Sequence, residues 1–202
     1  MLVGDYEGKP TMSNKVAEKR ILLDKFIPRP YQIDLCDAFE NKGYIKLIAI
    51  WPRRSGKDIV SFNLMLRSAL RKIGVYYYIL PTYAQGRKII FDSISNTGEK
   101  FIDFIPRELV ESTNSQEMKI KLINGSLIQV VGSDNVDSLV GTNPMGCIFS
   151  EYALQDPRAY QFIRPILSAN GGWAMFISTP RGKNNLWDLY QMALHSPDWF
   201  CS

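Results

Sequence analysis

Histidine and cysteine are scarce in this 202-residue sequence, and neither is arranged for the chemistry it commonly serves. The single histidine, His195, has no partner motif for a Ser-His-Asp triad and no spacing suited to a zinc ligand. The cysteines, Cys36, Cys147 and Cys201, are odd in number and also lack metal-ligand spacing. We therefore interpret them as reduced residues of an intracellular protein, with Cys147, inside an apolar run, in the core.

Long apolar runs, targeting signals and repeats are also lacking. No apolar run reaches the roughly 18 residues that indicate a membrane span, and the N-terminus has no signal-peptide pattern. We therefore expect no membrane partner, and we expect the protein to stay in the cytoplasm where it is made. Hydrophobic residues make up 46% and charged residues 22%, which suits one sizeable globular domain. The net charge of +4 is compatible with nucleic-acid binding without requiring it.

Residues 1–27 and 28–202 differ in pattern. The first part is polar with scattered charges and is predicted to be a leader or docking arm, which could include a short helix over Lys15–Phe26. In the second part, apolar and β-branched runs predict strands at Tyr44–Trp51, Val75–Pro81, Gly146–Ser150 and Trp173–Ser178. Helices are expected at about residues 57–72, 83–95 and 157–169, and from 184 onward. This alternation indicates an α/β domain whose mainly parallel sheet has helices on both faces.

One pair of strands is expected to be antiparallel. Met118–Ile123 and Ser126–Val131 flank Asn124-Gly125, which is the strongest short signal for a hairpin turn. We expect this antiparallel hairpin to lie at an edge of the sheet.

A phosphate loop is predicted between the first strand and the first helix of this domain. The segment Trp51–Asp58 (WPRRSGKD) places Lys57 where the backbone N–H groups of a turn and a helix N-terminus converge on an anion. It departs from G-x-x-x-x-G-K-[ST] twice, since Trp51 replaces the first glycine and Asp58 the final hydroxyl residue. The alternative for this segment is a basic solvated turn. The candidate ATP-binding residues are Arg53, Arg54, Ser55, Gly56, Lys57 and Asp58.

Two further strand ends carry candidate site residues. Cys147–Glu151 is an apolar strand that ends in an acid, and in P-loop ATPases a carboxylate at such a place polarises the attacking water. Alone, Glu151 would be interpreted as a solvated loop residue, but its pairing with a phosphate loop favours catalysis. Ser178 and Thr179 could sense the γ-phosphate, unless Pro180 simply ends their strand.

The segment Arg29–Gln32 (RPYQ) precedes the phosphate loop. A glutamine amide can both donate to and accept from an adenine edge, so Gln32 and the neighbouring Tyr31 are candidate ATP-binding residues. Taken in order, these segments resemble the large terminase subunits of tailed phages. Arg29–Gln32 looks like the family's adenine motif, Trp51–Asp58 like its arginine-bearing phosphate loop, Leu80–Gln85 like the segment after its second strand, and Ile177–Gly182 like its ATPase-coupling motif.

The resemblance covers nearly the whole of residues 28–202 and implies a P-loop NTPase of the additional-strand (RecA-like) class. It implies an ATPase that uses Mg²⁺ and drives double-stranded DNA into a procapsid in the host-cell cytoplasm. Such proteins act as a homo-oligomeric ring on a portal, together with a small terminase subunit. Because terminases also carry a C-terminal nuclease, we expect an ATPase domain without nuclease activity. The implied residues are Lys57, Glu151 and Arg53 for catalysis, and Ser178, Thr179 and Pro180 for coupling.

Two departures from the family concern the metal. Ser150 stands where relatives have a Mg²⁺-binding aspartate, and Asp58 stands where they have a hydroxyl residue. We hypothesise that the two groups have exchanged places and that both bind Mg²⁺, a hard cation that accepts either oxygen. Alternatively, Asp58 only stabilises the N-terminus of its helix.

A third departure is Val140-Gly141, before the acidic strand, where many relatives carry, before the glycine, an arginine that acts in trans as an arginine finger. The candidate substitutes for this arginine finger are Arg158, Arg164 and Arg181. Two other functions also fit this kind of fold. A helicase-like, nucleic-acid-dependent ATPase needs a second RecA-type half, which the sequence does not provide. A nucleotide-binding scaffold that has lost catalysis is suggested by the departures at the metal site.

Overall fold

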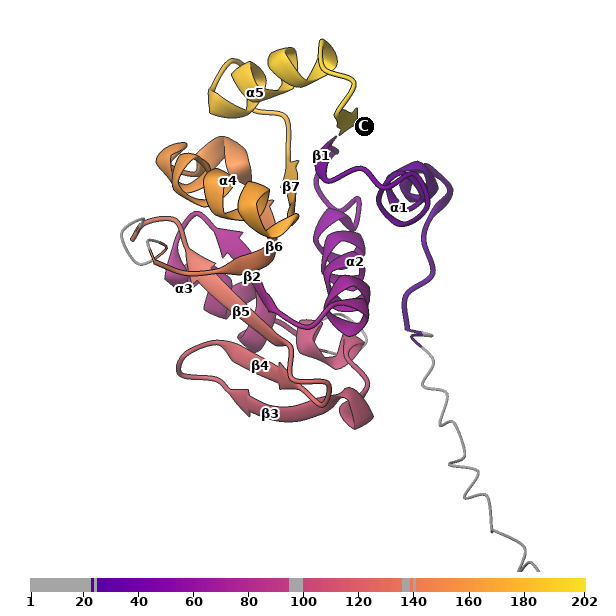
Figure 1. Ribbon diagram of the computed structural model, residues 1–202, viewed down its shortest axis with the longest axis vertical. Coiled ribbons are helices and arrows are strands. Elements are labelled where there is room, and N and C mark those ends of the chain that lie inside the picture. Colours follow the sequence, from indigo (N-terminus) through magenta and orange to yellow (C-terminus); the bar gives the residue numbers. More distant parts are fainter. Residues whose placement is uncertain (1–22, 24, 95–99, 136–138, 140) are drawn as a thin grey trace, which may run out of the picture.

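The computed structural model describes residues 23, 25–94, 100–135, 139 and 141–202. These residues form one eight-stranded sheet with helices packed against it (Figure 1). The strand order is β3-β4-β5-β2-β6-β7-β1-β8. The strands are β1 (Lys46–Ile50), β2 (Val75–Leu80), β3 (Val110–Asn114), β4 (Lys119–Leu122), β5 (Leu127–Gly132), β6 (Pro144–Ser150), β7 (Trp173–Ser178) and β8 (Trp199–Cys201).

Six neighbouring strands, from β5 through β2, β6, β7 and β1 to β8, run parallel. Strand β7 lies between β1, which leads into the phosphate loop, and β6, which leads into the acidic turn, formed by Glu151 and the 3₁₀ turn Tyr152–Leu154. This inserted strand confirms the expected additional-strand class. The register pairs Ile50 with Ser178 and Ser150 with Ile177, so β1, β7 and β6 end level with one another. The loops that follow these three strands therefore meet at the carboxyl ends of the parallel strands.

Helices cover both faces of the sheet, as expected (Figure 1). Helices α1 (Ile33–Glu40) and α2 (Lys57–Arg71) pack on one face, and α4 (Arg158–Asn170) and α5 (Asn185–Leu194) pack on the other. The alternation along β7 shows why two cores form. Met175 and Ile177 point into the core beneath α1 and α2, whereas Ala174 and Phe176 point into the core beneath α4 and α5.

The expected hairpin is present, and its turn contains Gly125 with a φ of 91°. Strand β5 of this hairpin also joins the parallel sheet, so only β4 is antiparallel to both of its neighbours. The two edge strands were not predicted: β3 is mostly polar and exposed, and β8 is three residues long. Helix α1 was also missed. The helix expected over residues 83–95 consists of α3 (Tyr83–Gly86) and a π-helical segment, Arg87–Asp92.

The leader and its helix over Lys15–Phe26 lie almost entirely outside the described residues, and its status as a separate arm stays a prediction. Within the described ranges, no helix is both long and apolar enough to cross a membrane.

Gly146 on β6 permits a close contact with the neighbouring strand. A Cβ atom at this position would lie 2.3 Å from Cε2 of Trp173 on β7. The indole is fixed in turn, because its Nε1 donates a 2.9 Å hydrogen bond to Ser68 Oγ on α2. Gly146 therefore lets an aromatic ring fill the space between the sheet and α2.

We expect Gly146→Ala to lower the free energy of unfolding by about 1–3 kcal/mol, because the added methyl group overpacks the core against Trp173. Urea denaturation measures this change. The loss should be smaller when Gly146→Ala is made in a Trp173→Phe background, since the colliding indole atoms are then removed. An unchanged loss in that background would contradict the proposed collision.

Candidate active site

The phosphate loop joins β1 to α2 through two residues with left-handed backbone. Arg54 has a φ of 62° and Gly56, the N-cap of α2, has a φ of 75°. This φ favours glycine at position 56. A Cβ atom on Gly56 would also approach the side-chain nitrogen of Gln32 to 3.1 Å. The left-handed residues Arg54 and Gly56 turn the N-terminus of α2 toward the carboxyl ends of β1, β7 and β6. Unpaired N–H groups and the helix dipole favour an anion at this N-terminus.

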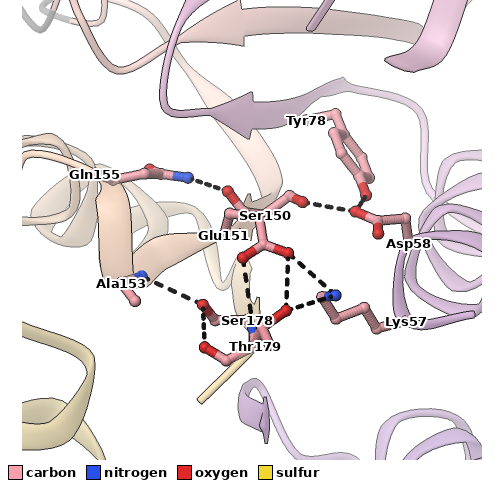
Figure 2. A network of polar contacts seen from close by, with 9 residues as sticks. All are labelled: Lys57, Asp58, Tyr78, Ser150, Glu151, Ala153, Gln155, Ser178 and Thr179. Carbon is pink, nitrogen blue, oxygen red and sulfur yellow. Dashed lines mark hydrogen bonds and ion pairs between the residues drawn. The ribbon is translucent and has the colours of Figure 1, made fainter. Parts of the chain in front are cut away.

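Lys57, the first residue of α2, reaches the ends of both β6 and β7 (Figure 2). Its side chain is only 6% exposed, and Nζ lies 3.0 Å from Glu151 Oε1. The same ammonium group donates a 3.2 Å hydrogen bond to Thr179 Oγ1. The lysine predicted for phosphate binding and the carboxylate predicted for water activation therefore form a largely buried ion pair.

Glu151 has an unusual backbone conformation for a residue that is not glycine. Its φ is 54° and its ψ is 44°, at the start of a 3₁₀ turn over Tyr152–Leu154. The carboxylate accepts a 3.3 Å hydrogen bond from Thr179 Oγ1 and a longer one, 3.5 Å, from the Thr179 amide. Left-handed backbone outside glycine is unfavourable unless surrounding contacts hold it, so this turn requires support.

Two amide side chains that were not predicted supply that support. Gln155 is buried, and its Nε2 donates to the carbonyl oxygens of Ser150 at 2.7 Å and Ile79 at 2.9 Å, which links the ends of β6 and β2. Asn185 Nδ2, at the start of α5, donates 2.8 Å and 3.2 Å hydrogen bonds to the carbonyls of Tyr152 and Gln155. The turn that aims Glu151 is thus fixed from both sides.

A second group of contacts surrounds Asp58 (Figure 2). Its Oδ1 accepts a 2.6 Å hydrogen bond from Ser150 Oγ and a 2.8 Å hydrogen bond from the hydroxyl of Tyr78. Tyr78 lies on β2 and was not predicted as a site residue. Burial, and then the charge of Asp58, raise the pKa of Tyr78 well above its ordinary value, so this hydroxyl keeps the proton that it donates. Both hydroxyl protons go to Oδ1, which leaves Oδ2 for another partner.

Asp58 and Ser150 are therefore brought together, as the exchange hypothesis requires. Carboxylate and hydroxyl oxygens are suitable ligands for Mg²⁺, which usually takes only one or two protein oxygens and keeps several waters. The described ranges contain no group of three or more histidine, cysteine or acidic side chains that could hold a metal ion. A metal here would depend on Asp58, Ser150, water and a phosphate group, and the role of these residues stays a prediction.

The coupling segment touches both loops. Ser178 Oγ accepts a 3.4 Å hydrogen bond from the Ala153 amide in the acidic turn, and the Ser178 carbonyl accepts a 3.1 Å bond from the Trp51 amide. Thr179 contacts Lys57 and Glu151, whereas Pro180 is exposed. The end of β7 thus lies between the phosphate loop and the acidic turn.

The Arg29–Gln32 segment lies against the phosphate loop. The Tyr31 hydroxyl and Gln32 Nε2 donate to the carbonyl oxygen of Ser55 at 2.7 Å and 2.8 Å. The exposed Arg53 and Arg54 help to line an adjoining pocket of about 450 Å³. The other residues that line it are Tyr31, Trp51, Pro52, Ser55 and Ser202.

The candidate substitutes for a trans-acting arginine occupy different places. Arg158 binds Asp156 through two guanidinium nitrogens at the start of α4, with Nε at 2.9 Å from Oδ2. Arg164 lies within α4, and Arg181 follows the coupling segment. Val140 lies outside the described residues. Which of the three arginines would act in trans on the ATP site of a neighbouring subunit stays a prediction.

Comparisons with known proteins agree with the expected resemblance. No protein-family model matches the sequence. The terminase large subunit of Escherichia phage T5 is 28% identical over 180 residues, which are 85% of this chain and 39% of that protein. The terminase large subunit of Thermus virus P23-45 is 25% identical over 188 residues, or 84% and 38%. The chain thus spans about two fifths of the length of these relatives.

Solved structures give the same result for the fold. The large terminase ATPase domain of Thermus phage P74-26 superposes with a TM-score of 0.72 at 19% identity, over 89% of this chain and 81% of that one. The large terminase of a thermophilic bacteriophage, in complex with ADP, gives a TM-score of 0.70 at 14% identity, over 86% and 44%. Another structure of this second terminase contains ATP-γ-S. The chain is similar to phage terminase large subunits and has the fold of their ATPase domains.

The contacts of Asp58 predict a stabilising role in the protein without nucleotide. We expect Asp58→Asn to lower the free energy of unfolding by about 2 kcal/mol, because each of two hydroxyl donors loses a charged acceptor, at about 1 kcal/mol each. Urea denaturation in a buffer without nucleotide or divalent cations measures the change.

Asp188→Asn is the matched control for this substitution. Asp188 also lies in the first turn of a helix, α5, but it is exposed. Its replacement should remove only the interaction with the helix dipole, about 0.3–1 kcal/mol. Equal losses in the two variants would show that the hydroxyl donors contribute nothing to the stability of the fold.

Proposed function

We propose that this chain is the ATPase domain of a phage large terminase subunit and that it hydrolyses ATP to translocate double-stranded DNA. The observation that carries this proposal is the meeting of Lys57, Glu151 and Thr179 at the ends of three adjacent parallel strands. The ADP and ATP-γ-S complexes of the similar terminase from the thermophilic bacteriophage support a nucleotide site.

The phosphate groups of ATP would bind at the N-terminus of α2, where the loop amides and Lys57 supply positive potential. Lys57 is paired with Glu151 in this structure, so a phosphate competes with the carboxylate for the same ammonium group. Binding of the nucleotide therefore releases Glu151 to act on water. The exposed Arg53 and Arg54 lie at the rim of the same loop and add positive charge there.

Hydrolysis then follows from the position of Glu151. The oxygen of a water molecule forms a bond to the γ-phosphorus while the bond between this phosphorus and the bridging β-γ oxygen breaks, which leaves ADP and inorganic phosphate. Glu151 accepts the proton that the water loses. Thr179, which contacts both Lys57 and Glu151, would report the loss of the γ-phosphate to β7.

We further propose that the reaction depends on Mg²⁺ and that Asp58 and Ser150 would be the protein ligands of this ion. When bound, Mg²⁺ neutralises charge on the phosphate oxygens. Tyr78 and Ser150 already offset the charge of Asp58 through hydrogen bonds, which reduces the repulsion between this carboxylate and a phosphate.

The partners of the whole terminase are proposals from the family. They are double-stranded DNA, further copies of the chain in a ring on the portal, and the small terminase subunit, at the procapsid in the host-cell cytoplasm. Turnover stimulated by double-stranded DNA, measured with the purified chain, would test the first of these. Turnover without any response to DNA would instead indicate a general ATPase.

The catalytic assignment predicts different defects for its two main residues. We expect Lys57→Ala to abolish ATP turnover, because the phosphates lose their buried cation. Glu151→Gln should still bind ADP but hydrolyse ATP at least about 100-fold more slowly, which is the scale of a lost general base. Phosphate release and ADP titration calorimetry measure the two properties.

Matched controls for these variants are Lys72→Ala, at the far end of α2, and the exposed Glu108→Gln. Both should behave like the unmodified chain. Near-normal turnover in Lys57→Ala would refute the phosphate-loop assignment. ADP binding that depends on Lys57 in a chain with no turnover, with or without DNA, would favour the nucleotide-binding scaffold.

The exchange hypothesis predicts thermodynamic coupling between positions 58 and 150. ADP affinity is measured for Asp58→Ser, Ser150→Asp and the double variant, first with Mg²⁺ and then with a chelator. The double variant should recover much of the Mg²⁺-dependent affinity that Asp58→Ser loses, with a coupling energy above about 0.5 kcal/mol. Coupling of the same size in both buffers would reflect only the hydrogen bond between the two side chains and would refute a shared metal.

A further inference from the structure

Both polar atoms of the Gln32 side-chain amide are hydrogen-bonded to the protein itself. Its Oε1 accepts a 2.9 Å hydrogen bond from the Arg29 amide, and its Nε2 donates a 2.8 Å hydrogen bond to the Ser55 carbonyl. The residue is only 2% exposed. An adenine edge must reach both a donor and an acceptor of the amide, and in this structure both are buried against the protein.

The partner of Gln32 is an informative one. The Ser55 carbonyl belongs to the peptide group that joins Ser55 to Gly56, immediately before Lys57. The Tyr31 hydroxyl donates to the same oxygen at 2.7 Å. Two neighbouring side chains from a different part of the chain therefore hold one carbonyl of the phosphate loop.

This contact affects the shape of the loop. Arg54 and Gly56 both have positive φ, so the peptide group of Ser55 lies between two left-handed residues. Its carbonyl must point away from the side on which the amides collect if these amides are to face an anion. Hydrogen bonds from Tyr31 and Gln32 fix that orientation, and the close approach of Gln32 to Gly56 restricts it further.

We propose that Gln32, assisted by Tyr31, is a positioning residue of the phosphate loop and does not read the nucleotide base. This inference rests on the proposed ATP site. The base instead faces the pocket beside the loop, where the half-exposed Tyr31 ring packs edge-on against Trp51 with centroids 5.6 Å apart. Such rings accept any base, because every base has a π face.

The experiment compares ligands that separate the base from the phosphates. Binding of ADP, GDP and inorganic pyrophosphate to the full chain is measured by titration calorimetry, before and after Gln32→Leu. We expect all three affinities to fall by a similar factor, about threefold to tenfold, which corresponds to one lost hydrogen bond. The ratio of ADP to GDP affinity should stay unchanged.

Because Gln32 is buried, Gln32→Leu could weaken binding by unfolding the protein. A second variant, at an exposed residue, therefore tests the same carbonyl contact. Tyr31→Phe removes the other donor to the Ser55 carbonyl but keeps the ring of a half-exposed residue. It should weaken pyrophosphate binding as well, although this ligand has no base. Gln161→Leu, at an exposed position on α4, is the matched control and should change none of the three affinities.

Two results would overturn the inference. A Gln32→Leu variant that loses affinity for ADP alone, with GDP and pyrophosphate unaffected, would assign Gln32 to adenine recognition. Unchanged affinities for all three ligands in both variants would show that the loop needs no such support. A different result marks failure of the proposed function: if the unmodified chain binds neither ADP nor pyrophosphate, there is no phosphate site to position.

Discussion

The ion pair between Lys57 and Glu151 is the contact around which the rest of the site is arranged. It requires β1 and β6 to end at the same height, with β7 between them, and the parallel register provides this. It also requires a loop that turns α2 toward the sheet and a turn that aims a carboxylate back at α2. Both contain left-handed residues, at Arg54, Gly56 and Glu151, and both are held by hydrogen bonds from distant segments, the loop by Gln32 and the turn by Asn185.

The charges of the site are balanced by different means. Glu151 is neutralised by a cation that a phosphate could claim, whereas Asp58 is stabilised by hydroxyl groups that carry no charge. In the proposed reaction, a bound phosphate would take the cation of the first arrangement, whereas it would not compete directly for the two hydroxyl donors of the second. The two carboxylates therefore suit the different tasks proposed for them: Glu151 can be released to the reaction, and Asp58 is already oriented beside it.

The sequence allowed the central strands and the main site residues to be predicted, because apolar runs and the order of motifs are local signals. Lys57, Glu151 and Thr179 were found in this way and do converge. Tyr78, Gln155 and Asn185 were not found, since each is an ordinary strand tyrosine or loop amide that also bonds to a partner far along the chain, which for Gln155 is Ile79. Edge strand β3 was missed because its polar residues lack the burial pattern of a central strand.

The left-handed backbone at Glu151 limits which sequences can serve at this position. β-Branched residues are excluded by their clash with the backbone, and glycine would fit but has no carboxylate. Asparagine and aspartate adopt this conformation more readily than glutamate, yet they are one methylene shorter and would fall short of Lys57. Glutamate is therefore the one acidic side chain that combines enough reach with this backbone, so natural variation at position 151 should be narrow even where its neighbours drift.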